Sequence, residues 1–152
     1  TVNLYLRIVE MIVPILVIVN IFLWYTIRRE PVLEEVKERY HTLREHLKKT
    51  DDQKFRMLHD EIPIVAYKGS FVRGVGYNTN KGQEIGLCID GKVNHVLHVL
   101  LHELAHCTVD EYSHSDDFWS NYEELRNEAI AIGVYDNIGT LTPFCGKQIV
   151  DK

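Results

Sequence analysis

Residues 101–119, LHELAHCTVDEYSHSDDFW, place His102 and His106 one helical turn apart, with Glu103 between them. Side chains four residues apart lie on the same face of an α-helix, so both imidazoles can reach one metal ion. Zinc accepts neutral imidazole nitrogen and takes about three protein ligands when a catalytic position stays open. We therefore predict a zinc site with His102 and His106 as ligands.

Glu103 is predicted to act on water rather than on the metal. Zinc lowers the pKa of a water molecule toward neutrality, which makes it a nucleophile. A neighbouring carboxylate can take the proton of that water and pass it to a leaving amine. Glu103 is thus the predicted general base of peptide-bond hydrolysis, and Tyr112, Tyr122 and Tyr135 are candidates, by residue type alone, for stabilising the oxyanion.

Apolar residues surround this pair along a helix that we expect to begin near Asn94, its predicted N-cap. They are Val96, Leu97, Val99, Leu100, Leu101, Leu104 and Ala105. Two histidines and a glutamate in such surroundings cost free energy unless something binds them. His95 and His98 lie too far along the same straight helix to be ligands, and we expect them beside the site or at the surface.

The residues themselves leave the third ligand open. His114 lies just past the expected helix end, where the chain can turn back. Glu124 and Glu128, on the next helix, are the alternatives, as carboxylate ligands.

The rest of residues 61–152 is expected to form a small α+β domain. Two β-type runs, IPIVAYKG and EIGLCID, flank the turn-rich segment SFVRGVGYNTNKG, which predicts a small antiparallel sheet. The segment 116–136 predicts an amphipathic helix that stops at Gly133. The tail after it is expected to be irregular.

Residues 1–30 are predicted to be a transmembrane anchor. The run Met11–Ile27 has no charged residue, and extending it back to Leu4 approaches the length that a bilayer requires, so residues 4–27 would contact lipid. Trp24 and Tyr25 suit a membrane interface. Arg28-Arg29 follow, and the positive-inside rule then places the rest of the chain on the cytoplasmic side.

Residues 31–60 are expected to contain an amphipathic linking helix. Leu33, Val36, Tyr40, Leu43 and Leu47 form one apolar stripe along it. The stripe is long enough for about two heptads of a coiled coil, but packing onto the chain's own domain is the simpler interpretation.

Composition limits the binding partners and the cellular compartment that we expect for this protein. The net charge is −5 and residues 1–30 are slightly basic, so the remaining domain is acidic and nucleic acid is not an expected partner. Cys88, Cys107 and Cys145 are odd in number and widely spaced, without a C-x-x-C pair. We expect three reduced, mostly buried thiols, which suits a reducing compartment.

The segments LLHELAH, HSDDFW and AIAIGVYD together resemble the WLM/SprT-like family of zincin metallopeptidases. The resemblance implies a minimal zincin-like fold, a protein or peptide substrate, zinc held by His102, His106 and His114, and Glu103 as general base. It is closest to the small membrane-anchored WLM-like proteins of large DNA viruses, which GYNTNKGQEIGLCID and PFCGKQI also resemble. A virion inner-membrane location, with other virion or capsid proteins as partners, is therefore implied.

Two functions from different classes remain open on the sequence. The first is a membrane-anchored zinc-dependent metallopeptidase. The second is a structural virion or membrane-associated protein, of the minor capsid type, that keeps a zincin fold with little or no protease activity. A fourth protein ligand would support the second function, because a closed coordination shell leaves no position for water.

Overall fold

The computed structural model describes residues 2–28, 30–69 and 74–151. Arg29, and residues 70–73 of the predicted turn-rich segment, lie outside the described residues. The chain divides into two compact units, Thr1–Pro31 and Val32–Lys152.

The first unit is essentially one helix, α1 (Val2–Arg28). Its stretch Asn3–Ile27 has a mean hydropathy of 2.3 and is long and apolar enough to cross a membrane. Two polar side chains within it bond their own helix: the Asn20 amide donates to the Leu16 carbonyl and the Thr26 hydroxyl to the Leu23 carbonyl. Such internal bonds reduce the cost of placing polar groups in lipid.

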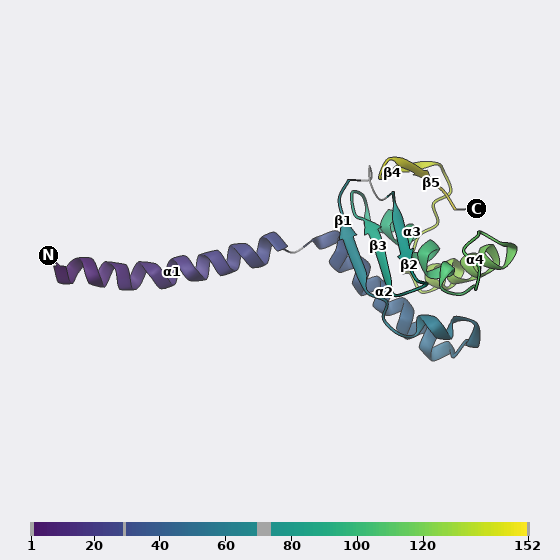
Figure 1. Ribbon diagram of the computed structural model, residues 1–152, viewed down its shortest axis with the longest axis horizontal. Helices are drawn as coiled ribbons and strands as arrows, with labels where there is room; N and C mark the ends of the chain where they lie inside the picture. Colours follow the sequence, from purple (N-terminus) through teal and green to yellow (C-terminus); the bar gives the residue numbers. More distant parts are fainter. Residues whose placement is uncertain (1, 29, 70–73, 152) are drawn as a thin grey trace. The chain divides into compact units, whose positions relative to one another are not determined.

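The elements that follow α1 make up the second unit (Figure 1). They are α2 (Pro31–Thr50), the 3-10 helix η1 (Gln53–Leu58), β1 (Ile64–Tyr67), β2 (Gly76–Thr79), β3 (Glu84–Cys88), α3 (Val93–His106), α4 (Asp116–Ala131), β4 (Thr142–Phe144) and β5 (Lys147–Ile149). The predicted α+β class is confirmed.

The three-stranded sheet has the order β1-β3-β2 and is mixed. β2 and β3 form an antiparallel hairpin, in which Gly76 pairs with Leu87. β1 pairs with the other edge of β3 in parallel, with Ile64 opposite Ile85. The prediction of a wholly antiparallel sheet is therefore wrong for β1. The hairpin occupies one edge of β3 and leaves the other edge to β1.

Helix α3 packs closely on β2 and β3 (Figure 1). A Cβ atom at Gly76 would lie 2.4 Å from Val99 Cγ1 and 3.2 Å from Glu103 Oε1. Only glycine permits this approach, which sets β2 against the part of α3 that carries the predicted site.

Helix α2 buries its apolar stripe in the core of the second unit, where Val36, Tyr40, Leu43 and Leu47 are all shielded from solvent. The Ile62 amide donates to the Tyr40 hydroxyl, which ties the helix to the chain just before β1. The apolar stripe of α2 thus packs onto the chain's own domain, as predicted, and does not serve a coiled coil.

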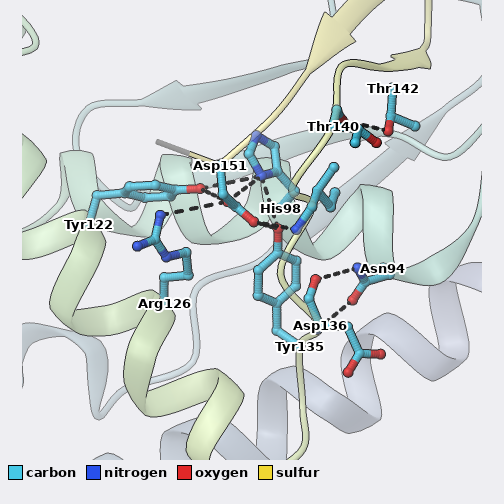
Figure 2. Close-up of polar contacts among 10 residues, drawn as sticks. Asn94, His98, Tyr122, Arg126, Tyr135, Asp136, Thr140, Thr142 and Asp151 are labelled. Carbon is cyan, nitrogen blue, oxygen red and sulfur yellow. Dashed lines mark hydrogen bonds and ion pairs between the residues drawn. The ribbon is translucent and has the colours of Figure 1, made fainter.

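The N-terminus of α3 has no side-chain cap, whereas that of α4 has one. α3 begins after Lys92, so Asn94 is not its N-cap. The Asn94 side chain instead bonds both the amide and the carbonyl of Asp136, beyond α4 (Figure 2). α4 is capped by Ser115, and Gly133 follows its last residues with a φ of 72°, as predicted for a helix stop.

The C-terminal tail is a hairpin of β4 and β5 rather than irregular chain. Cys145 and Gly146 form its turn, both with positive φ, as a two-residue hairpin turn of type I′ requires. A disulfide joins Cys88 to Cys145, so the expectation of three reduced thiols is wrong for this pair, while Cys107 is free. The two cysteines are 57 residues apart, and only the folding back of the tail brings them together.

Asp151 anchors the end of this tail between α3 and α4 (Figure 2). Its side chain is 2% exposed. Its carboxylate is paired with groups from three parts of the domain: His98 at 3.1 Å, the Tyr122 hydroxyl at 2.8 Å, the Tyr135 hydroxyl at 2.6 Å, the Ile138 amide at 2.7 Å and Arg126 at 4.0 Å. Since His98 precedes His102 by one turn of α3, this cluster clamps the two helices directly behind the predicted site.

The pKa of Asp151 lies below its usual range. Burial alone would raise this pKa, but the hydrogen bonds from His98, Tyr135, the Ile138 amide and Tyr122 outweigh the cost of burial. The carboxylate is therefore more stable in the folded protein than in the unfolded chain.

We expect Asp151→Asn to lower the free energy of unfolding at neutral pH by about 2–3 kcal/mol, because hydrogen bonds to buried charged groups are worth roughly 1.5–3 kcal/mol. A depressed folded pKa stabilises the protein above the unfolded pKa of about 3.9, and this contribution is lost as the pH falls through the folded pKa. The difference between wild type and variant should therefore shrink below about pH 4. Urea unfolding of the full chain in detergent measures it, with the exposed Asp60→Asn as the control. A difference that stays constant down to about pH 3 would contradict the assigned role of the carboxylate.

Candidate metal centre

Three imidazoles converge at the end of α3. His102 and His106 come from its last turns, and His114 comes from the connection to α4. The Nε2 atom of His114 lies 3.0 Å from that of His102 and 3.1 Å from that of His106. Four-coordinate zinc with bonds of about 2.0–2.1 Å would separate its nitrogen ligands by about 3.3 Å. The three nitrogens therefore have the spacing of ligands to a single ion.

Electrostatics favours the metal-binding form of these imidazoles. Burial, together with the neighbouring histidines, lowers the pKa of His102 to about 3. Burial, His114 and the nearby Lys81 also lower the pKa of His106. Both rings are thus neutral at neutral pH, and a neutral imidazole offers a lone pair to a metal.

The two alternative third ligands, Glu124 and Glu128, lie on α4 but point away from the histidine pair. Glu124 forms an ion pair with Lys54, and Glu128 lies 2.6 Å from His46. Both carboxylates thus have partners in the α2–η1 region, and neither belongs to the histidine cluster. Of the three candidates, the structure brings only His114 to the histidine pair.

Phe118 packs against all three imidazoles and is fully buried. Its ring centroid lies 5.0 Å from that of His102, 4.4 Å from that of His106 and 4.7 Å from that of His114. The Ser115 hydroxyl caps α4 by accepting from the Phe118 amide, at 3.1 Å. The spacing between His114 and Phe118 is therefore what brings the third imidazole and its aromatic support to the same place.

Glu103 is 8% exposed and lies beside His106 in a hollow of about 150 Å³. The other residues that line the hollow are Asn78, Lys81 and Tyr112. Burial raises the pKa of Glu103 to about 7, and a cation held by the adjacent imidazoles would favour its charged form. A carboxyl group with a pKa near neutrality is suited to general base catalysis.

The ligand loop, which we define as residues 107–115, carries His114 and Tyr112. Lys81, from the turn between β2 and β3, donates to the carbonyls of Val109 and Glu111 in this loop. Asn121 on α4 donates to the Thr108 hydroxyl, at 2.9 Å. The loop has no helix or strand of its own, so these side chains supply hydrogen bonds that regular structure would otherwise provide.

The three tyrosines proposed by residue type differ in their surroundings. Tyr122 and Tyr135 donate to Asp151 (Figure 2). Burial, together with Asp151, raises the pKa of both phenols. Tyr112 is 74% exposed and lines the hollow beside Glu103. Of these three, only Tyr112 lines the hollow that Glu103 and His106 share.

Sequence reasoning missed Asn78, Lys81 and Asp151. Asn78 donates to the Glu103 carbonyl, at 2.8 Å, and to the Cys107 sulfur, at 3.1 Å. Asn78 and Lys81 lie in the segment that was predicted only to be rich in turns, and Asp151 in a tail that was predicted to be irregular. Asn and Lys are common in turns, so residue type offered no signal for either position.

Comparison with known proteins gives two kinds of similarity. The chain is 36% identical to uncharacterized protein 136R of Invertebrate iridescent virus 6, over 40% of this chain and 38% of that protein. The chain thus matches well under half the length of this curated relative. The crystal structure of Wss1 from Saccharomyces cerevisiae superposes with a TM-score of 0.51 at 22% identity, over 69% of this chain and 81% of that one. A Wss1 mutant superposes with a TM-score of 0.52 at 19% identity, over 69% of this chain and 86% of that one. At these identities the two structures establish the fold.

The family model described as the WLM domain matches residues 65–140, a range that holds both α3 and α4 and all three clustered histidines. Proteins of this family are typically metallopeptidases with a zincin-like fold, and zinc dependence is general among them. The match covers half of the chain. The chain therefore belongs to the WLM domain family.

Proposed function

We propose that this protein is a membrane-anchored zinc-dependent metallopeptidase. The observation that supports the proposal most strongly is the cluster of three imidazole nitrogens, two of them on rings kept neutral by burial, next to the buried carboxyl group of Glu103. His102, His106 and His114 would hold the metal. Zinc, when bound, supplies a Lewis acid that lowers the pKa of water and polarises a peptide carbonyl.

Glu103 would transfer the protons of the reaction, first as general base and then as general acid. Its carboxylate accepts a proton from the attacking water and returns that proton to the nitrogen of the departing amine. The hollow that Glu103 shares with His106 and Tyr112 leaves space of about 150 Å³ beside the carboxylate for the group that is cleaved. Gly76 keeps β2 close to this side of Glu103 and so limits the water around it.

A fourth protein ligand would support the structural alternative, whereas the contacts near the cluster favour an open position. Within the described ranges, the group of potential ligands consists of the three histidines. Cys107 follows His106 directly, but its sulfur is engaged with the Asn78 amide and the Glu103 carbonyl. A catalytic site keeps such an open position, whereas a structural zinc site fills it.

Glu103→Gln should retain zinc and lower kcat/KM for peptide hydrolysis by about 10²–10⁴, which is the usual contribution of a general base. Glutamine has nearly the same shape but cannot accept the proton. Metal content is measured by elemental analysis of the full-length protein in detergent. Cleavage is followed by mass spectrometry on unfolded casein and a proteome-derived peptide library.

The matched control is Glu38→Gln, because Glu38 is an exposed carboxyl group on α2, away from the cluster. We expect it to cleave like wild type. Equal cleavage by wild type and Glu103→Gln would remove Glu103 as the base. A wild-type protein that binds zinc but cleaves nothing would favour the structural alternative.

The membrane part of the proposal rests on α1. Its length and hydropathy suit a bilayer, and the two arginines that follow the apolar run in the sequence, Arg28 and Arg29, favour a domain on the cytoplasmic side. In that orientation, the Cys88–Cys145 disulfide requires a thiol oxidant on the same side of the membrane, since cytosolic disulfides are rare. Protein substrates at that membrane surface, including other proteins of a virion, would suit this arrangement.

Replacing Ile15 and Val19 together by arginine should release the protein from carbonate-washed membranes. Each arginine near the centre of a span costs about 2.5–3.5 kcal/mol on insertion scales. Fractionation of cells that express the full chain measures the effect, with the Ile15→Leu and Val19→Leu double variant as control. Retention of the arginine variant in the washed membranes would contradict the anchor.

A further inference from the structure

The turn between β2 and β3 is rigidly built and docked on α3. Asn80 and Lys81 have positive φ values of 45° and 53°, and the Gly82 amide donates to the Asn78 side chain, at 2.8 Å. The same Asn78 side chain donates to the Glu103 carbonyl. Lys81 therefore projects from a platform whose position relative to the histidine helix is fixed.

From this platform the Lys81 ammonium reaches across to the middle of the ligand loop. It donates to the carbonyls of Val109 and Glu111 and lies 4.7 Å from the centre of the Tyr112 ring. Hydrogen bonds from a charged donor are about twice as strong as neutral ones, and a cation over an aromatic face adds a further attraction. One side chain thus fixes three residues that lie two to five positions before His114.

The two ends of the ligand loop are held independently of Lys81. Thr108 bonds the Ala105 carbonyl and accepts from Asn121, while Ser115 bonds Glu111 and caps α4. Loss of Lys81 would therefore loosen the centre of the loop and leave α3 and α4 in place. In the loosened loop, the fraction of molecules with His114 at the other two imidazoles would fall, and the apparent metal affinity would fall with it.

We propose that Lys81 is a positioning residue of the metal centre: it holds the ligand loop so that His114 completes the site and Tyr112 forms the wall of the hollow beside Glu103. This inference rests on the proposed function, because it assumes that the cluster binds zinc. It adds to that function the residue that places the third ligand: the Lys81 ammonium, from the turn between β2 and β3, holds the loop that carries His114.

Zinc affinity of the full-length protein in detergent, measured by competition with a fluorescent chelator, tests the proposal. We expect Lys81→Met to weaken zinc binding by about 10- to 100-fold, the effect typical of residues that orient metal ligands. Lys81→Arg should recover much of the affinity, because a guanidinium can also donate to two carbonyls. Lys147→Met, at an exposed lysine of β5, should bind zinc like wild type.

A second measurement separates positioning from general stability. We expect the unfolding transition of the metal-free Lys81→Met protein to stay close to that of metal-free wild type, because both ends of the loop keep their bonds. An unchanged zinc affinity in Lys81→Met would overturn the inference while leaving the proposed function intact. A lower stability of the metal-free variant, with no loss of affinity in its folded fraction, would overturn it as well. Failure of wild type to bind zinc would instead overturn the proposed function.

Discussion

The structure depends on one arrangement: the Nε2 atom of His114 must lie about 3 Å from those of His102 and His106, although those two rings are partly buried and His114 is exposed. Burial keeps the rings of His102 and His106 neutral, so each has a lone pair that a metal ion between the rings can bind. Helix α3 supplies two of the nitrogens through its own period, and the third comes from the ligand loop, which has no regular structure. Much of the small domain serves to hold that third group in place.

Three parts of the fold hold the third imidazole and its supporting helices in place. The β2–β3 turn holds the ligand loop through Lys81, α4 supports the imidazoles through Phe118, and the C-terminal tail clamps α3 to α4 through Asp151. The tail is in turn tied to the end of β3 by the disulfide between Cys88 and Cys145. A domain of this size has little core to spare, so polar clusters and a covalent link carry part of the stability that a larger core would supply.

The parts of the site that follow from local periodicity could be predicted from the sequence. His102, Glu103 and His106 share one helix, and the spacing of four residues alone puts both imidazoles on one face. The class of the fold and the stop of α4 at Gly133 likewise follow from local patterns. The choice of His114 over Glu124 and Glu128 needed either the family resemblance or the structure, because loop geometry decides it.

The features that sequence reasoning missed all depend on contacts between distant segments. β1 pairs in parallel with the edge of β3 that the β2–β3 hairpin leaves open, and β1 and β3 are about twenty residues apart in the sequence. The partner of Cys88 lies in a tail whose hairpin could not be recognised, and Asp151 acquires its role only when that tail returns to α3 and α4. A single aspartate or cysteine forms no periodic pattern in the sequence. A pattern along the chain therefore cannot reveal which distant residues it will contact.

X-ray absorption at the zinc edge, on the full-length protein loaded with one equivalent of zinc, tests the central claim most directly. The account predicts three imidazole nitrogens and one oxygen at about 2.0–2.1 Å. A shell that contains sulfur at about 2.3 Å, which would assign Cys107 as a ligand, or one with fewer than three imidazoles, would contradict it.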